Sequence, residues 1–309
     1  MQGRKDARTQ GRKAALVAGV VAALAVSVTA TGYTTAGADD QVKLSREEKL
    51  IAKGKTKVTK YFNSKGQLVA EAATKPEDTV TLVQAGDGAV EGINIKPYEP
   101  ESAAEEAEMA AELTPEDLEQ RRSLGAGATL PASGPVVIPT ADGDVGLIYD
   151  TGCARIDGGE QWWYGCYERR SVREADDNYD YRLDSSLLSG RHRGWWGGIT
   201  RGRTAHDYDD DGASVLVVKW SPTASLDTGN CKTRTAGFSY RGVNLSESYQ
   251  FCPEQINPFI REQHFHSEWK GYVTDGDRTV PTHGFNSVRY ASGKPTGFVY
   301  KIIGTHVDY

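Results

Sequence analysis

The sequence predicts an all-β fold: a single β-sandwich or jelly-roll-like domain with disulfides, preceded by a signal peptide and a weakly structured α+β pro-segment or tether. Short runs rich in valine, tyrosine, tryptophan and phenylalanine recur from about residue 145 onward, separated by Asp-Gly, Ser-Gly and Gly-Asn pairs. This is the pattern of short strands joined by turns. All 4 cysteines, 6 tryptophans and 6 histidines also fall after residue 150, so the chemically informative side chains lie in this region.

The N-terminus predicts export. Arginines and lysines between Arg4 and Lys13 precede an uncharged stretch over 14–38, which ends in the small residues Ala36-Gly37-Ala38. This is a secretory signal pattern with a cleavage site. Threonines and glycines dilute the apolar stretch, which favours a cleaved signal over the alternative of a membrane anchor. We therefore expect a secreted, extracellular protein with no membrane span after cleavage.

The segment after the signal predicts small, separated elements. Ser45 and Glu48 form a capping box for a helix that would end at Gly54,. The turn at 63–66 predicts a hairpin between 58–62 and 67–70, and Thr114-Pro115 predicts the start of another helix,. The segment has no tryptophan or cysteine, so it can bury little surface against the entropy of ordering it,. The predicted division of the chain is a signal peptide over 1–38, a charged pro-segment or spacer with short helices and a hairpin over 39–123, a linker over 124–144, and a disulfide-stabilised β domain over 145–309.

The β domain should contain strands in the β-rich runs, with Asp275-Gly276 as the turn of a hairpin,. No helical periodicity is sustained over a dozen residues. The expected strands cover 145–149, 162–167, 214–220, 238–240, 287–290 and 297–303.

The cysteines predict two structural disulfides, because thiols of an exported protein meet an oxidising environment. Local pairing, Cys153 with Cys166 and Cys231 with Cys252, closes the shorter loops. The alternative of a four-thiolate zinc site lacks the paired C-x-x-C spacings that such sites use.

An alternating acidic string predicts a calcium loop. Asp207, Asp209 and Asp211 precede Gly212, and carboxylates at positions 1, 3 and 5 of a loop can converge on one ion,. The string resembles the first half of an EF-hand loop, but Val218 stands where the bidentate glutamate belongs. The alternative is an acidic turn in solvent that leads into a strand.

A second alternating string predicts one face of a strand with zinc ligands. His264, His266 and Glu268 alternate with Phe265 and Trp269, which a period of two places on the opposite face,. If Asp275-Gly276 closes a hairpin, counting places His283 opposite Glu268, and the three imidazoles with the carboxylate form a reasonable zinc set. The string His264-Phe265-His266 resembles the zinc strand of the alpha carbonic anhydrases, although the spacing to His283 departs from that family. The alternative is the solvent-facing side of an amphipathic strand.

Aromatic residues predict a ligand-contacting surface. Adjacent tryptophans on a strand point to opposite faces, so one of each pair can be exposed and stack on a sugar ring. The expected contacts are Trp163, Tyr164, Trp195 and Trp196. Arg201 and Arg203 follow the second pair, and arginine beside aromatic residues can hold polyanions,. The formal net charge of −6 gives no strong nucleic-acid signal, so we interpret these arginines as ordinary strand residues,.

These patterns favour a secreted binding module for an extracellular glycan or cell-surface ligand, with calcium fixing a loop. The first alternative is a secreted zinc-dependent hydrolase or lyase that uses His264, His266 and His283. The second is a secreted toxin or inhibitor with a removable pro-segment. No G-x-S-x-G, P-loop or H-E-x-x-H motif is present, and no catalytic residue is assigned,.

Overall fold

A computed structural model of the chain describes residues 44–86, 88–100, 102–123, 136–138, 146–159, 161–172, 178–192, 198–208, 215–227, 232–241, 243–251, 255–273, 278–291, 294 and 296–307. The signal peptide predicted over 1–38 lies outside the described residues. The described part consists mostly of strands in antiparallel sheets with few helices, which confirms the all-β prediction.

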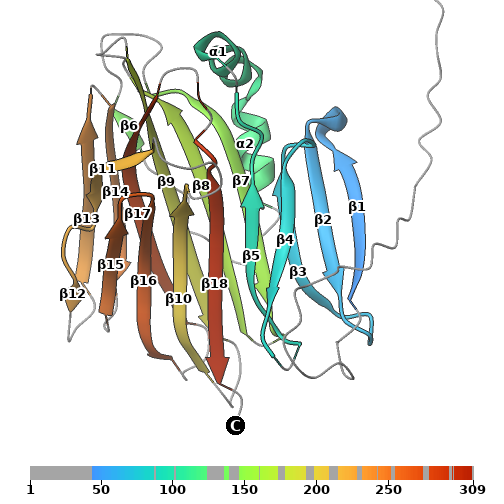
Figure 1. Cartoon of the computed structure of the whole chain (residues 1–309). Coiled ribbons are helices and arrows are strands. Elements are labelled where there is room, and N and C mark those ends of the chain that lie inside the picture. The colour runs from blue at the N-terminus through green and yellow to red at the C-terminus, as the bar shows by residue number, and fades with distance from the viewer. Residues whose placement is uncertain are drawn as a thin grey trace, which may run out of the picture.

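The strands form two large sheets and one small sheet (Figure 1). The first sheet has 8 strands in the order β1 (Ser45–Ile51), β2 (Thr56–Phe62), β3 (Leu68–Thr74), β7 (Ile148–Asp157), β8 (Gln161–Ser171), β9 (Tyr179–His192), β17 (Arg278–Ala291) and β11 (Leu216–Ser221). The second sheet has 7 strands in the order β12 (Leu226–Asp227), β15 (Gln255–Arg261), β16 (His264–Val273), β10 (Gly198–Asp207), β18 (Val299–Val307), β5 (Val90–Lys96) and β4 (Thr79–Gln84). The third sheet has 3 strands in the order β13 (Lys232–Tyr240), β14 (Val243–Phe251) and β6 (Val136–Ile138).

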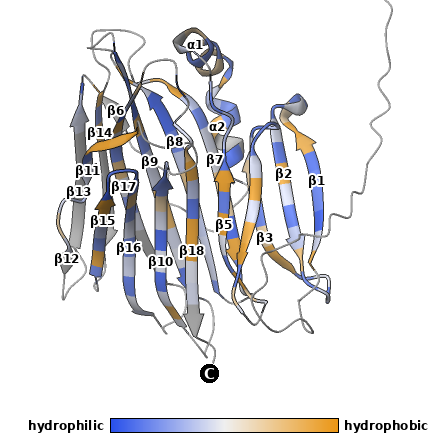
Figure 2. Cartoon of the chain, in the orientation of Figure 1, coloured by the Kyte–Doolittle hydropathy of each residue, from blue (hydrophilic) through white to orange (hydrophobic). Residues whose placement is uncertain are grey.

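The two large sheets pack face to face around an aromatic core. Trp163 on β8 meets Trp269 on β16 with ring centroids 6.0 Å apart. Glycines make room for the Trp163 indole, because a Cβ added at Gly190, Gly202 or Gly304 would lie 2.0 to 2.3 Å from it. Figure 2 shows hydrophobic residues prominent in β4 and β5 and hydrophilic residues recurring along β10 and β16.

The third sheet covers part of the outer face of the first sheet. Val243 and Leu245 of β14 form a core cluster with Leu183 of β9 and Phe285 of β17. Phe285 and Gly284 are neighbours on β17 and point to opposite faces, and Gly284 faces Phe265 of the second sheet,. Odd-numbered residues of β17 therefore face outward from the core between the large sheets.

The segment assigned to a separate spacer contributes strands to both large sheets, which differs from the predicted division of the chain. β3 pairs with β7, and β5 pairs with β18. The hairpin prediction is confirmed by β2 and β3, whose turn is closed by hydrogen bonds from the backbone N–H groups of Lys65 and Gln67 to Asn63 Oδ1, both 3.0 Å long. The helix predicted over 45–54 is wrong. Its residues form β1 and a short 3-10 turn, η1 (Ala52–Gly54), because pairing with β2 outweighs the local capping signal,.

Two helices follow β5 and contact β7: α1 (Ala103–Glu112) and α2 (Pro115–Ser123). The helix predicted at Thr114-Pro115 is confirmed. Thr114 and Asp117 cap it reciprocally, since the Asp117 N–H donates to Thr114 Oγ1 and the Thr114 N–H donates to Asp117 Oδ2, both at 3.1 Å,. Figure 1 shows α1 at one end of the stacked sheets.

Buried ion pairs tie this helical segment to the sheets. Glu99 accepts hydrogen bonds from Arg169 at 2.8 Å and from Arg182 at 3.1 Å, and Glu106 of α1 accepts from Arg182 at 3.1 Å. Arg169 also donates to Asp184 at 3.2 Å. Both arginines are buried, so removing the segment would leave Arg182 with a buried charge and neither carboxylate, which is strongly destabilising,.

One predicted disulfide is confirmed. Cys153 of β7 and Cys166 of β8 are directly opposite each other in the strand pairing and are bonded. Cys231 and Cys252 lie outside the described residues. Among the helices that the structure describes, none is long and apolar enough to cross a membrane.

Candidate functional site

The structure does not expose Trp163 or Tyr164, so the prediction that they contact a ligand is wrong. Trp163 is 2% exposed in the core between the sheets, and Tyr164 is 1% exposed beside Trp162 and the disulfide. The alternation along β8 was predicted correctly, but the tryptophan and tyrosine side chains on both faces of this strand are buried. Trp195 and Trp196 lie outside the described residues.

The expected zinc set does not assemble. β16 and β17 do not form a hairpin with each other: β16 pairs with β10 and β15, and β17 pairs with β9 and β11. His283 lies on the outer side of the first sheet, in line with Phe285, whereas His264 and His266 lie on the outer side of the second sheet,. Within the described residues, no group of three or more histidine, cysteine, aspartate or glutamate side chains is arranged to hold a metal ion.

Of the predicted calcium ligands, only Asp207 is described, and Asp209 and Asp211 lie outside the described residues. Asp207 ends β10 and its carboxylate pairs with Lys301 of β18. A calcium ion would therefore have to compete with an ammonium group for this carboxylate.

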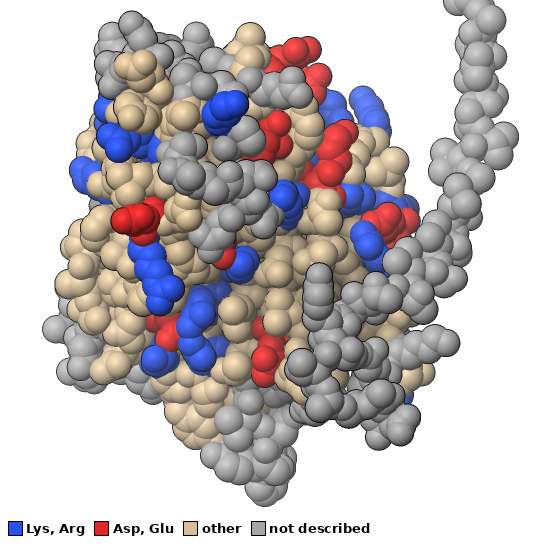
Figure 3. Space-filling view, in the orientation of Figure 1, with Lys and Arg blue, Asp and Glu red and all other residues tan. Residues whose placement is uncertain are grey.

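An open groove of about 910 Å³ lies on the outer face of the second sheet, over β10, β15 and β16. It is lined by four cationic and two acidic side chains, a net charge of +2 with the histidines neutral, although the whole chain carries −6. Figure 3 shows lysine and arginine side chains gathering on this face. The charged lining consists of Arg201, Arg203, Arg261, Lys270, Glu262 and Glu268.

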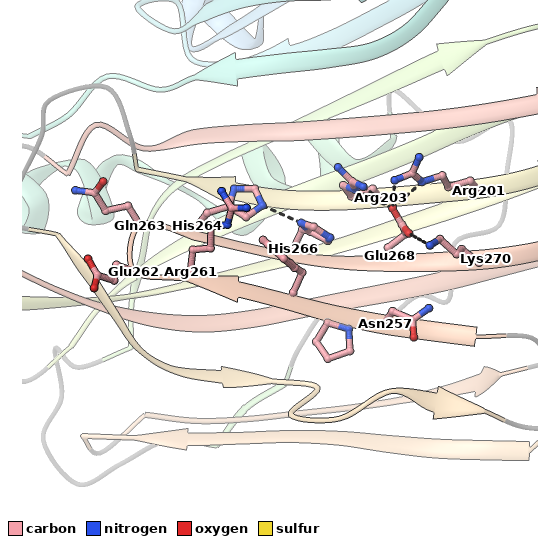
Figure 4. A pocket seen from close by; sticks show the side chains of 12 residues that line it. Arg201, Arg203, Asn257, Arg261, Glu262, Gln263, His264, His266, Glu268 and Lys270 are labelled. Carbon is pink, nitrogen blue, oxygen red and sulfur yellow. Dashed lines mark hydrogen bonds and ion pairs between the residues drawn. The ribbon is translucent and has the colours of Figure 1, made fainter.

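Three cations share one carboxylate in this groove (Figure 4). Glu268 Oε2 accepts from Arg201 Nε and from Arg203 Nη2, both at 2.6 Å, and Lys270 Nζ lies 2.9 Å from Oε1. Burial would raise the pKa of Glu268, but the hydrogen bonds from Lys270, Arg203 and Arg201 outweigh it and lower the pKa to about 2. Glu268 is therefore always ionised at neutral pH, and it orients the cations without neutralising all of them.

An aromatic unit adjoins the cations. His264 and His266 share a hydrogen bond of 2.8 Å, and the His266 ring stacks on Phe259 with centroids 4.9 Å apart and planes 15° apart. Burial, together with the charge of Arg203, lowers the pKa of His266 to about 3, so its ring is neutral at physiological pH. Phe259 is 40% exposed, which leaves apolar ring surface available in the groove.

The period-two pattern predicted for 264–269 is confirmed in its geometry. Phe265 and Trp269 are fully buried, while His264, His266 and Glu268 line the groove. The sequence analysis did not identify Phe259 and Asn257 as groove residues. Asn257, Phe259 and Arg261 alternate with the same period of two along β15, and this pattern could have identified them,.

The comparisons with known proteins add no identity, since no family model matches the chain and no curated protein matches it.

Proposed function

We propose that the protein is a secreted binding module, built on a β-sandwich scaffold, that recognises an anionic extracellular glycan or anionic cell-surface ligand through the groove over β10, β15 and β16. The observation that carries the proposal is the sharing of Glu268 by Arg201, Arg203 and Lys270. A carboxylate that binds three cations leaves donor groups and positive charge for a second anion, because each guanidinium has five N–H donors.

The accessibility of the cations supports this proposal. The side chains of Arg201 and Lys270 are 39% and 54% exposed, whereas Glu268 is 4% exposed beneath them. An incoming anion therefore meets the cations first. Calcium is not part of the proposal, because Asp207 is paired with Lys301.

The geometry favours neither alternative function. A zinc-dependent hydrolase or lyase would need His283 beside His264 and His266, and the two large sheets separate them. A toxin or inhibitor with a removable pro-segment would have to give up the buried pairs that Glu99 and Glu106 make with Arg169 and Arg182.

Affinity electrophoresis tests the proposal. We expect polygalacturonate in the gel to retard the protein and neutral dextran to leave its mobility unchanged, because the site recognises charge. The double variant Arg201→Ala/Arg203→Ala should lose the retardation. Lys65→Ala, which removes an exposed lysine from the β2–β3 turn, should retain it. Equal retardation of wild type and the double variant would sink the proposal.

A further inference from the structure

The strand register places two binding positions along the groove. Lys270 lies opposite Arg201 on β10, and His266 lies opposite Phe259 on β15. Glu268 stands between them on β16. His266 precedes Glu268 by two residues and Lys270 by four on β16. At about 3.4 Å per residue, the aromatic unit at His266 is therefore about 7 to 14 Å along the strand from the cations around Glu268. A small anion at the cluster cannot reach the aromatic unit.

The second position combines a ring surface with its own cation. Arg261 places its guanidinium carbon 5.2 Å from the centroid of Phe259. The exposed ring can pack against the apolar face of a sugar, and the guanidinium can contact a negative charge beside it. The groove thus offers two cationic positions with an aromatic surface at one of them.

We propose that the ligand is a linear acidic polysaccharide that lies in extended form along β16 and contacts both positions at once. This inference rests on the proposed function and specifies the ligand class. Such a polymer carries ring faces and negative charges along its length, and simultaneous contacts at linked positions raise affinity far above that of either contact alone.

The charge pattern favours a polysaccharide over a nucleic acid. A nucleic-acid strand carries one charge per about 3.4 Å, a closer spacing than one carboxylate per sugar ring in an acidic polysaccharide. The net charge of −6 on the whole chain also opposes a densely charged polymer at long range,. Sparse charges and one exposed aromatic ring in the groove suit a polymer of lower charge density.

Isothermal titration of the full chain, without its signal peptide, with galacturonate oligomers tests the inference. Affinity should rise about 100-fold from dimer to hexamer, because only the longer ligand spans both positions. Arg261→Ala should abolish most of this rise, because it removes the cation of the second position. Arg201→Ala/Arg203→Ala should weaken every oligomer, and Lys65→Ala should change none.

The outcomes separate this inference from the proposed function. Equal affinity for dimer and hexamer would overturn the polymer inference and leave the anion site intact. Tighter binding of oligothymidylate than of hexagalacturonate at equal charge would replace the polysaccharide with a nucleic acid. No binding of any of these anions to the wild type would overturn the proposed function itself.

Discussion

Substitution of Glu99 by glutamine should destabilise the protein strongly, because this side chain connects the helical segment to the buried arginines of the first sheet. Its carboxylate accepts hydrogen bonds from Arg169, Arg182 and Thr296, and also from the backbone N–H of Phe298. A glutamine of the same shape would turn N–H donors toward two guanidinium groups and remove the negative charge between them.

The expected loss follows from the partners that remain. Breaking one partner of a buried ion pair costs about 3 to 5 kcal/mol. Arg169 keeps Asp184 and Arg182 keeps Glu106, so we expect the lower end, about 3 kcal/mol,. For a domain of this size that free energy corresponds to a fall in Tm of about 6 to 12 °C.

The loss should depend on pH with a defined sign. Burial works to raise the pKa of Glu99, but Arg169 and Arg182 outweigh it and hold the pKa below its ordinary value of 4.5. The stabilisation is therefore fully present above pH 4.5 and disappears as the pH falls through the lowered value in the folded state. Wild type and variant should converge in acid.

Urea denaturation at several pH values, followed by tryptophan fluorescence, measures these differences. Glu108→Gln, an exposed position on α1, is the matched control and should change stability by less than about 0.5 kcal/mol,. A Glu99→Gln protein as stable as the control at pH 7 would refute the conclusion that the buried pairs of Glu99 stabilise the fold.

Further substitutions test the core, the titrating groups and the disulfide. Gly304→Ala should lower the free energy of unfolding by about 1 to 3 kcal/mol or more, because the new Cβ would lie 2.0 Å from the buried Trp163 indole,. The control is Gly86→Ala, whose new Cβ meets nothing within 4 Å. Equal stability of the two variants in urea would contradict the packing around Trp163. Burial, together with a neighbouring carboxylate, raises the pKa of Asp78 from 3.8 to about 8, so wild-type stability should decline as the pH rises from 4 to 8,. Asp78→Asn should flatten that decline in pH-dependent urea melts, and an unchanged slope would argue against a raised pKa. Replacing Cys153 and Cys166 together by alanine should lower the free energy of unfolding by about 2 to 4 kcal/mol, and no difference from the oxidised wild type would show that the bond does not stabilise the fold,.

The alternation of polar and apolar residues predicted correctly which face of a strand each side chain occupies. The residues 264–269 alternate between core and groove as their sequence indicates, since a side chain's face depends only on its own strand,. The hairpin assumption for His283 failed because an Asp-Gly pair in the sequence does not reveal whether the following strand joins the same sheet or the other one, and β16 and β17 belong to different sheets.

Burial that depends on distant strands was out of reach from sequence. Trp163 lies in a slot formed by glycines of β9, β10 and β18, which no local pattern connects to it. The strand at 68–74 likewise connects β1 and β2 to the rest of the first sheet by pairing with β7, more than 70 residues away. The groove could be predicted only in part. The sequence indicated the strand of His264, but not that β10 brings Arg201 and Arg203 beside it and β15 brings Phe259.

The salt dependence of polygalacturonate binding tests the central claim most directly. We predict that the logarithm of the affinity falls linearly with the logarithm of salt concentration for the wild type, and that Arg201→Ala/Arg203→Ala makes this dependence clearly shallower, because two cations that release counterions from the ligand are removed. An affinity and a salt dependence that are identical in the wild type and the double variant would contradict an anion-binding site formed by the cations around Glu268.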